Sequence, residues 1–121
     1  MTLLLVEDLE DLRAVLQRTL SANGFEVLAA ADAEEALQLA AQPRIKVDLL
    51  FVDWQLPGMS GRALAQELIR LHPDLRVLLT SGQIQVDQHD LQWLQGRGEY
   101  LAKPYDLMVM LAALRRLKHP S

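Results

Sequence analysis

The sequence predicts an α/β domain in which five parallel strands alternate with five helices in the order (βα)5. Short, nearly continuous apolar runs such as Leu3–Val6 and Leu49–Val52 are typical of strands that are buried on both faces. The longer segments between these runs place apolar residues three or four positions apart, as on one face of a helix. This alternation predicts a doubly wound parallel sheet with helices on both faces.

Each predicted strand is a short apolar run that ends at a polar residue or at a turn. The third run is the clearest, because Asp53 closes it and Leu56-Pro57-Gly58 follows shortly after. The expected strands cover residues 2–6, 25–30, 48–52, 76–79 and 99–102.

Capping residues indicate where the helices begin. Asp32 precedes the second predicted helix, and Glu35 three positions later completes a capping box. Ser60 and Asp106 stand in the same place before the third and the last helix. Helix ends are marked by Asn23-Gly24 after the first helix (residues 10–22), by Pro43 after the second and by Pro73 after the third.

The periodic apolar residues of the helices are expected to face the sheet. They are Leu9, Leu12, Val15, Leu16 and Leu20 in the first helix; Ala33, Ala36, Leu37 and Ala40 in the second; Leu64, Leu68 and Leu71 in the third; and Leu107, Met110, Leu111, Leu114 and Leu117 in the last. The segment from Gln83 to Arg97 has the weakest helical pattern, with Val86, Leu91, Trp93 and Leu94 as its apolar positions.

The composition limits the class of protein. The 121 residues are expected to form a single domain, residues 1–121, and the lack of cysteine excludes disulfides and zinc–thiolate sites. No apolar stretch approaches the ~20 residues that a membrane span needs. The N-terminal residues lack the basic region and the long apolar region of a signal peptide, so we expect a cytoplasmic protein.

The charge of the chain argues against direct nucleic-acid binding. The net charge is −4, whereas nucleic-acid modules usually carry a basic patch. The one cationic cluster, Arg115-Arg116-Leu117-Lys118, lies in the last predicted helix, where the helix dipole favours cations.

Polar residues of four kinds follow the predicted strands. Glu7-Asp8 follows the first strand, Asp53 the third, Thr80-Ser81 the fourth and Lys103 the fifth. In open α/β sheets the ligand site lies beyond the carboxyl ends of the strands. We therefore expect two acids, a third acid, a hydroxyl and an amine to meet at one edge.

Each of these residues also has a purely structural interpretation. Glu7 and Asp8 suit a helix N-terminus, and Asp53 suits a turn. Together, three carboxylates repel one another unless a cation such as Mg²⁺ lies between them. Asp53 would then be a nucleophile that forms an aspartyl phosphate, with the Thr80 hydroxyl and the Lys103 amine reaching the phosphoryl group. Pro104 restricts Lys103 to an extended backbone, and a cis bond between them would aim the amine inward.

These residues resemble the receiver domains of bacterial response regulators in two-component signalling, from Leu3 to about Leu117. The motifs are Val6-Glu7-Asp8, Asp53 with Leu56-Pro57-Gly58-Met59-Ser60-Gly61, Leu79-Thr80-Ser81-Gly82, and Lys103-Pro104-Tyr105. The resemblance implies a flavodoxin-like fold with strand order 2-1-3-4-5. It also implies that the domain is regulatory and not an enzyme that turns over a substrate.

The resemblance assigns a role to each residue of the site. Asp53 would take a phosphoryl group from a histidine kinase or a phosphotransfer domain. Glu7, Asp8, Asp53 and the backbone carbonyl of Gln55 would bind Mg²⁺, with Mn²⁺ as an alternative. Thr80 and Lys103 would contact the phosphoryl group, the backbone of Ser81 would lie beside it, and Tyr100 would be a rotameric switch coupled to Thr80. The side chains at Gln55 and Gly82 would set how fast water removes the phosphoryl group, and Gly82 would leave water access open.

The resemblance also implies partners. The output face would comprise the fourth helix, the fifth strand and the fifth helix, with Trp93, Met108 and Val109 as exposed apolar contacts and a homodimer as one arrangement. The run Val77–Gly82 resembles receivers that are attached to hybrid sensor kinases.

Other functions fit the sequence less well. A pseudo-receiver that binds proteins without phosphorylation is the main alternative, although all five key side chains are present. An aspartyl-nucleophile phosphatase usually has a second acid where Gln55 stands. A flavin-binding protein needs a phosphate-cradling loop where Glu7–Asp11 stands. The histidines, His72, His89 and His119, show no metal-ligand spacing and are expected at the surface.

Overall fold

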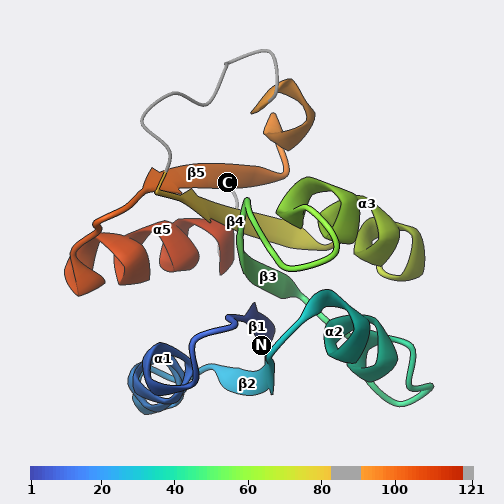
Figure 1. The fold of residues 1–121 in the computed structure, drawn as a ribbon, viewed down its shortest axis with the longest axis horizontal. Coiled ribbons are helices and arrows are strands. Elements are labelled where there is room, and N and C mark those ends of the chain that lie inside the picture. The colour runs from blue at the N-terminus through green and yellow to red at the C-terminus, as the bar shows by residue number, and fades with distance from the viewer. Residues whose placement is uncertain (83–90, 119–121) are drawn as a thin grey trace.

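The computed structural model describes residues 1–82 and 91–118 as a five-stranded sheet with helices on both faces (Figure 1). All four strand pairings are parallel, and the strand order is β2-β1-β3-β4-β5, which confirms the predicted fold class. The strands are β1 (Thr2–Val6), β2 (Glu26–Ala30), β3 (Leu49–Asp53), β4 (Arg76–Ser81) and β5 (Gly98–Ala102).

The helices form two layers. In Figure 1, α1 (Glu10–Ala22) and α5 (Leu107–Lys118) lie on one side of the sheet, and α2 (Ala33–Ala40) and α3 (Gly61–Leu71) lie on the other. A short 3₁₀ helix, η1 (Gln92–Leu94), precedes β5. It falls within the helix predicted at residues 83–97; residues 83–90, which include Val86 and His89, lie outside the described residues.

Strand β3 divides its side chains between two cores. Leu50 and Val52 belong to the core under α2 and α3, whereas Leu49 and Phe51 belong to the core under α1 and α5. All four are at most 3% exposed, as expected for a strand covered on both faces.

The predicted helix caps are confirmed. The Asp32 carboxylate accepts a hydrogen bond from the Glu35 N–H at 2.8 Å, and the Ser60 hydroxyl accepts one from the Ala63 N–H at 3.0 Å. The Asp106 carboxylate accepts one from the Met108 N–H at 2.6 Å. Each cap satisfies a backbone donor that the first helical turn leaves free.

Four side chains that were predicted to face the core are exposed instead: Leu9 (61%), Val15 (49%), Leu71 (50%) and Leu107 (42%). Leu9, Leu71 and Leu107 lie at helix ends, where the periodic pattern continues but the sheet beneath no longer covers the side chain. Val15 lies beside the buried stripe of Leu16 and Leu20 in α1.

The sequence also predicted that Trp93 and His72 would be exposed, and both predictions were wrong. Trp93 is only partly exposed and packs against the core under α2 and α3, while Met108 (73%) and Val109 (48%) are exposed as predicted. His72 is partly buried: its Nε2 lies 2.9 Å from the Ala40 carbonyl, and its Nδ1 accepts from the Val47 N–H at 3.4 Å. The ring therefore joins the end of α2 to the start of β3. His119 lies outside the described residues.

Candidate functional site

The polar residues that follow the strands gather at the carboxyl edge of the sheet, because the register of neighbouring strands aligns them. Val6 pairs with Val52, Asp53 with Thr80, and Ser81 with Ala102. The residues that follow these pairs extend from the same edge of β1, β3, β4 and β5.

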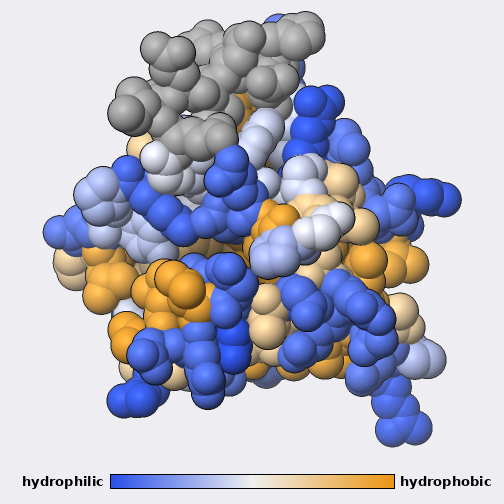
Figure 2. Space-filling view, viewed as in Figure 1, coloured by the Kyte–Doolittle hydropathy of each residue, from blue (hydrophilic) through white to orange (hydrophobic). Residues whose placement is uncertain are grey.

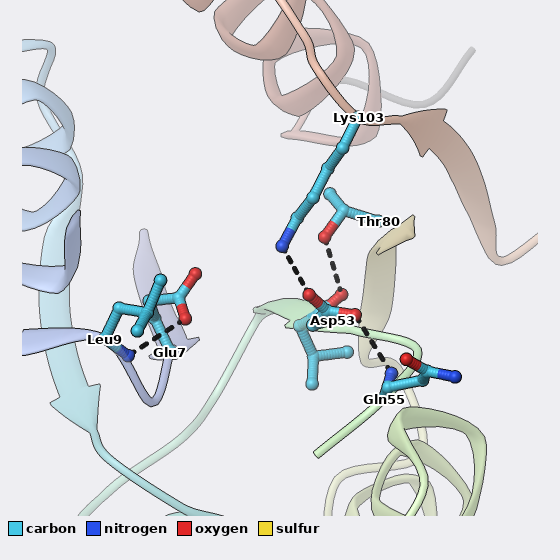
Figure 3. Close-up of polar contacts among 7 residues, drawn as sticks. Glu7, Leu9, Asp53, Gln55, Thr80 and Lys103 are labelled. Atoms are coloured by element: carbon cyan, nitrogen blue, oxygen red, sulfur yellow. Dashed lines mark hydrogen bonds and ion pairs between the residues drawn. The ribbon is translucent and has the colours of Figure 1, made fainter. Parts of the chain in front are cut away.

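Asp53 is the last residue of β3, and both of its carboxylate oxygens have partners (Figure 3). Its Oδ1 accepts a hydrogen bond from the Gln55 N–H at 2.9 Å. Its Oδ2 forms an ion pair with the Lys103 Nζ. The side chains of Asp53 and Lys103 are 17% and 28% exposed, so a small molecule or a partner residue can reach this pair.

Lys103 reaches Asp53 from the end of β5. Its backbone N–H donates to the Ser81 carbonyl at 2.8 Å, which fixes the residue against β4. The peptide bond between Lys103 and Pro104 is cis.

Glu7 is buried and Asp8 is exposed, although the two acids are adjacent. The Glu7 Oε2 accepts a hydrogen bond from the Leu9 N–H at 3.2 Å, and its backbone carbonyl accepts from the Arg13 Nη1 at 2.9 Å. Burial raises the pKa of Glu7, and a hydrogen bond with Asp8 raises it further. The fold therefore places the Glu7 carboxyl group where ionisation is unfavourable.

The Thr80 hydroxyl lies on the neighbouring strand, close to Asp53 (Figure 3). Thr80 and Ser81 are 2% and 1% exposed. The Thr80 Oγ1 is 3.5 Å from the backbone carbonyl of Val52, so in this structure it is turned to the backbone before Asp53. The backbone carbonyl of Thr80 accepts from the Trp54 N–H at 2.7 Å.

Tyr100 stands in β5 opposite Leu79, one position from Thr80. Its side chain is partly buried and packs against the core under α2 and α3. Tyr100 is thus joined to the site through β4 and does not itself contact Asp53 through any hydrogen bond among the described residues.

Two residues near the site were not singled out for a role by the sequence. The Tyr105 ring lies 6.1 Å from the Phe51 ring, and its pKa is raised to about 12 by burial and by the charges of Glu7 and Asp53. A Cβ at Gly61 would lie 2.1 Å from the Asp53 carbonyl oxygen, so only glycine fits there. The signals were present as Lys103-Pro104-Tyr105 and as the second glycine of the loop after Asp53, but neither reveals a contact by itself.

The donor set suits a hard cation in its chemistry, because Glu7, Asp8, Asp53 and a backbone carbonyl offer only oxygen ligands. Among residues 1–82 and 91–118, however, no three acidic, histidine or cysteine side chains already converge closely enough to hold a metal ion. Both Asp53 oxygens are engaged by Gln55 and Lys103.

No helix in the described part of the chain is long and apolar enough to cross a membrane.

Comparison with known proteins agrees with this architecture. The family model of the response regulator receiver domain matches residues 3–115. Response regulator MprA of Mycobacterium leprae (strain TN) is 33% identical over 117 residues, which are 97% of this chain and 50% of that protein. The chain thus spans about half the length of the curated relatives of this kind that it matches.

Solved structures show the same fold. The receiver domain of the hybrid histidine kinase CckA has a TM-score of 0.82 at 30% identity, covering 98% of this chain and 100% of that one. A response regulator of Burkholderia pseudomallei, with a phosphorylated aspartic acid, a calcium ion and citrate, has a TM-score of 0.78 at 32% identity, covering 97% of this chain and 68% of that one. The chain belongs to the family of response regulator receiver domains.

Proposed function

We propose that Asp53 is the phosphoacceptor of this receiver domain and that a histidine kinase or a phosphotransfer domain is the donor. The observation that carries the proposal is the ion pair between Asp53 and Lys103 at the carboxyl end of the central strand, open enough for a donor to approach. The phosphorylated aspartic acid in the similar Burkholderia pseudomallei structure supports the same chemistry.

In the proposed reaction, a carboxylate oxygen of Asp53 attacks the phosphorus of a phosphohistidine. The new O–P bond forms as the P–N bond breaks, and the electron pair of that bond stays on the imidazole, which leaves neutral when its other nitrogen carries a proton. The Lys103 ammonium stays beside the acceptor and balances negative charge on the phosphoryl oxygens. Phosphoryl transfer depends mostly on such positioning and charge balance.

Glu7, Asp8, Asp53 and the backbone carbonyl of Gln55 would hold Mg²⁺, or Mn²⁺ in its place. Such a cation supplies charge neutralisation for the transferred phosphoryl group. Among the described residues no three such side chains converge yet, so Asp8, which is exposed, and Asp53 would have to come closer to Glu7 to hold the cation. Burial raises the pKa of Glu7, and a cation beside it would offset that cost of ionising the side chain.

We further propose that Thr80 and Tyr100 convert phosphorylation into a change of surface. The Thr80 hydroxyl would leave the Val52 carbonyl for a phosphoryl oxygen, with the Ser81 backbone alongside, and Tyr100 would move into the space that opens. The surface of β5 and α5, with Met108 and Val109 exposed, would then bind a downstream protein or a second copy. Of the fourth helix predicted for the output face, residues 83–90 lie outside the described residues, and η1 falls in the remaining part.

Intact-mass spectrometry after incubation with acetyl phosphate and Mg²⁺ tests the proposal. The wild-type chain is expected to gain one phosphoryl group, and Asp53→Asn is expected to gain none. Asp11→Asn, which removes an exposed acid from α1, is the matched control and should be modified like the wild type. A wild-type chain that forms no adduct with acetyl phosphate or beryllofluoride would instead support a pseudo-receiver that acts only by binding proteins.

A further inference from the structure

A hollow of about 700 Å³ lies between the start of α2 and the loop that joins β3 to α3. We call it the α2 groove. Ala33 and Leu37 of α2 form one apolar wall, and Pro57 and Met59 of the loop form the other. Leu37 and Met59 also pack on the core beneath, so the walls are anchored to the body of the domain.

The loop side of the α2 groove includes Gly58, which is exposed. Its φ of +81° is a conformation that favours glycine, and a Cβ built there would meet no atom within 4 Å among the described residues. The backbone is therefore exposed between Pro57 and Met59, and a chain lying in the groove could approach it closely.

The charged residues that line the α2 groove in the described part of the chain are both acidic. Asp32 and Glu34 are exposed at its rim, and among residues 1–82 and 91–118 no cationic side chain lines it. In Figure 2, the loop that joins β3 to α3 is a pale to orange area, and strongly hydrophilic residues over α2 border it. An apolar channel with an acidic rim is complementary to an apolar side chain that has cationic neighbours.

The acidic rim lies near the carboxyl edge of the sheet. Val6 pairs with Ala30, so Asp8 and Asp32 each follow by two residues the paired ends of neighbouring strands. The α2 groove therefore begins at the same edge of the sheet as Asp8, and it is bounded by the loop that leaves Asp53.

We propose that the α2 groove binds a peptide segment of a partner protein that carries a bulky apolar side chain flanked by Lys or Arg. The apolar side chain would lie between Leu37 and Met59, and its cationic neighbours would pair with Asp32 and Glu34. This segment is a better match than a second copy of the chain, because two copies with a net charge of −4 repel each other. The binding does not require phosphorylation and extends beyond the acceptor role of Asp53.

Selection from a random peptide library on the wild-type chain, followed by fluorescence anisotropy with the selected synthetic peptides, tests this inference. The rim variant is Glu34→Lys/Gln38→Lys, which changes two exposed residues and keeps the Asp32 cap. Glu10→Lys/Gln17→Lys makes the same substitutions on exposed positions of α1, and Glu10, like Glu34, lies in a first helical turn. Thermal unfolding checks that both variants fold.

The expected peptides contain an apolar residue beside Lys or Arg. The rim variant should weaken their binding at least tenfold, whereas the α1 control should change it less than twofold. Leu37→Ala should also weaken it without altering the charge. The inference is overturned if no peptide is selected, if the selected peptides lack cationic residues, or if the rim variant and the α1 control bind equally well. It is also overturned if sedimentation shows a wild-type dimer that the rim variant abolishes, because the occupant is then a second copy.

Discussion

Glu7 is an acidic residue whose side chain is almost completely buried. It is 5% exposed, its pKa is raised mainly by burial, and its partners are one backbone N–H and the neighbouring Asp8. A raised pKa in the folded state means that folding favours the protonated form. The contribution of Glu7 to stability is therefore present at acidic pH and is lost as the pH rises through its folded-state pKa.

Glu7→Gln is expected to unfold at a higher temperature than the wild type at pH 7 when no divalent cation is present, because the amide removes the buried charge. Added Mg²⁺ should raise the unfolding temperature of the wild type and leave that of Glu7→Gln nearly unchanged. Circular dichroism melts with and without Mg²⁺ measure both effects. Glu10→Gln, at an exposed position, should behave like the wild type. A Glu7→Gln chain that melts lower than the wild type without cation would contradict this account.

Tyr105 should make stability fall at alkaline pH. Its folded-state pKa is about 12 against an ordinary value of 10.0, so the folded chain holds the phenolic proton longer than the unfolded chain does. The stability contribution is complete below about pH 10 and is lost between about pH 10 and 12. Urea unfolding at pH 9 and pH 11 should show a larger loss for the wild type than for Tyr105→Phe. If both proteins lost the same stability between pH 9 and pH 11, Tyr105 would not be the group responsible for the alkaline loss.

At the scale of elements, the loop from β3 to α3 is pressed against the strand that it leaves. The Gly61 N–H donates to the Trp54 carbonyl at 2.7 Å, and Gln55 forms an isolated bridge with Ser60. This close return holds the backbone around Asp53, and it is achieved by the lack of a side chain at Gly61.

Gly61→Ala should destabilise the domain by about 1–3 kcal/mol, because the new methyl group forces the loop away from the Asp53 carbonyl. It should also slow phosphorylation by acetyl phosphate. Gly82→Ala is the control: it introduces a methyl group with no neighbour within 4 Å among the described residues, and its effect on stability should stay within about 0.5 kcal/mol. Urea titration gives both values. Equal effects of the two substitutions would show that the loop adapts freely.

The same elements show what the sequence could and could not predict. Strand runs and caps such as Asp32 and Ser60 were predicted correctly, because an apolar run or a cap hydrogen bond depends on neighbours in the sequence. Leu71 was placed wrongly because helical periodicity does not tell where the sheet beneath a helix ends. The position of His72 between α2 and β3 depends on residues 25 to 32 positions away and leaves no periodic signal.

The candidate site was also predictable only in part, because contacts between residues far apart in the sequence leave no local signal. The meeting of the polar residues at the carboxyl edge follows from a parallel sheet, which the alternation of strands and helices predicts, whereas the strand order was implied by the family resemblance. The partners of the side chains could not be predicted, because they arise from contacts between distant strands and loops. Examples are the Thr80 hydroxyl turned toward Val52, the burial of Glu7 beside an exposed Asp8, and the packing of Tyr105 on Phe51.

At the scale of the whole molecule, the proposed switch requires a signal to cross from β3 to β5 through β4. Thr80 pairs with Asp53 on one side and with Leu101 on the other, and Tyr100 is adjacent to that residue. Thr80 on β4 thus lies between Asp53 and the surface of β5.

Fluorine NMR of the chain labelled with fluorotyrosine should detect this transmission, because the chain contains two tyrosines and Tyr100→Phe assigns their signals. Beryllofluoride with Mg²⁺ is expected to shift the Tyr100 resonance in the wild type. Thr80→Val should reduce that shift, whereas Thr19→Val, whose hydroxyl bonds within α1, should not. An undiminished shift in Thr80→Val would show that the signal bypasses Thr80.

The division of β3 between two cores has a consequence for competition among ligands. Phe51 and Val52 point into opposite layers immediately before Asp53, so a displacement of this strand end alters the packing under α1 and α5 and the packing under α2 and α3 together. If one ligand binds the α1 and α5 layer and another binds the α2 and α3 layer, and each favours a particular position of this strand end, each ligand changes the affinity for the other. The factor is the same in both directions. Two proteins that never touch could in this way help or exclude each other on a single small domain.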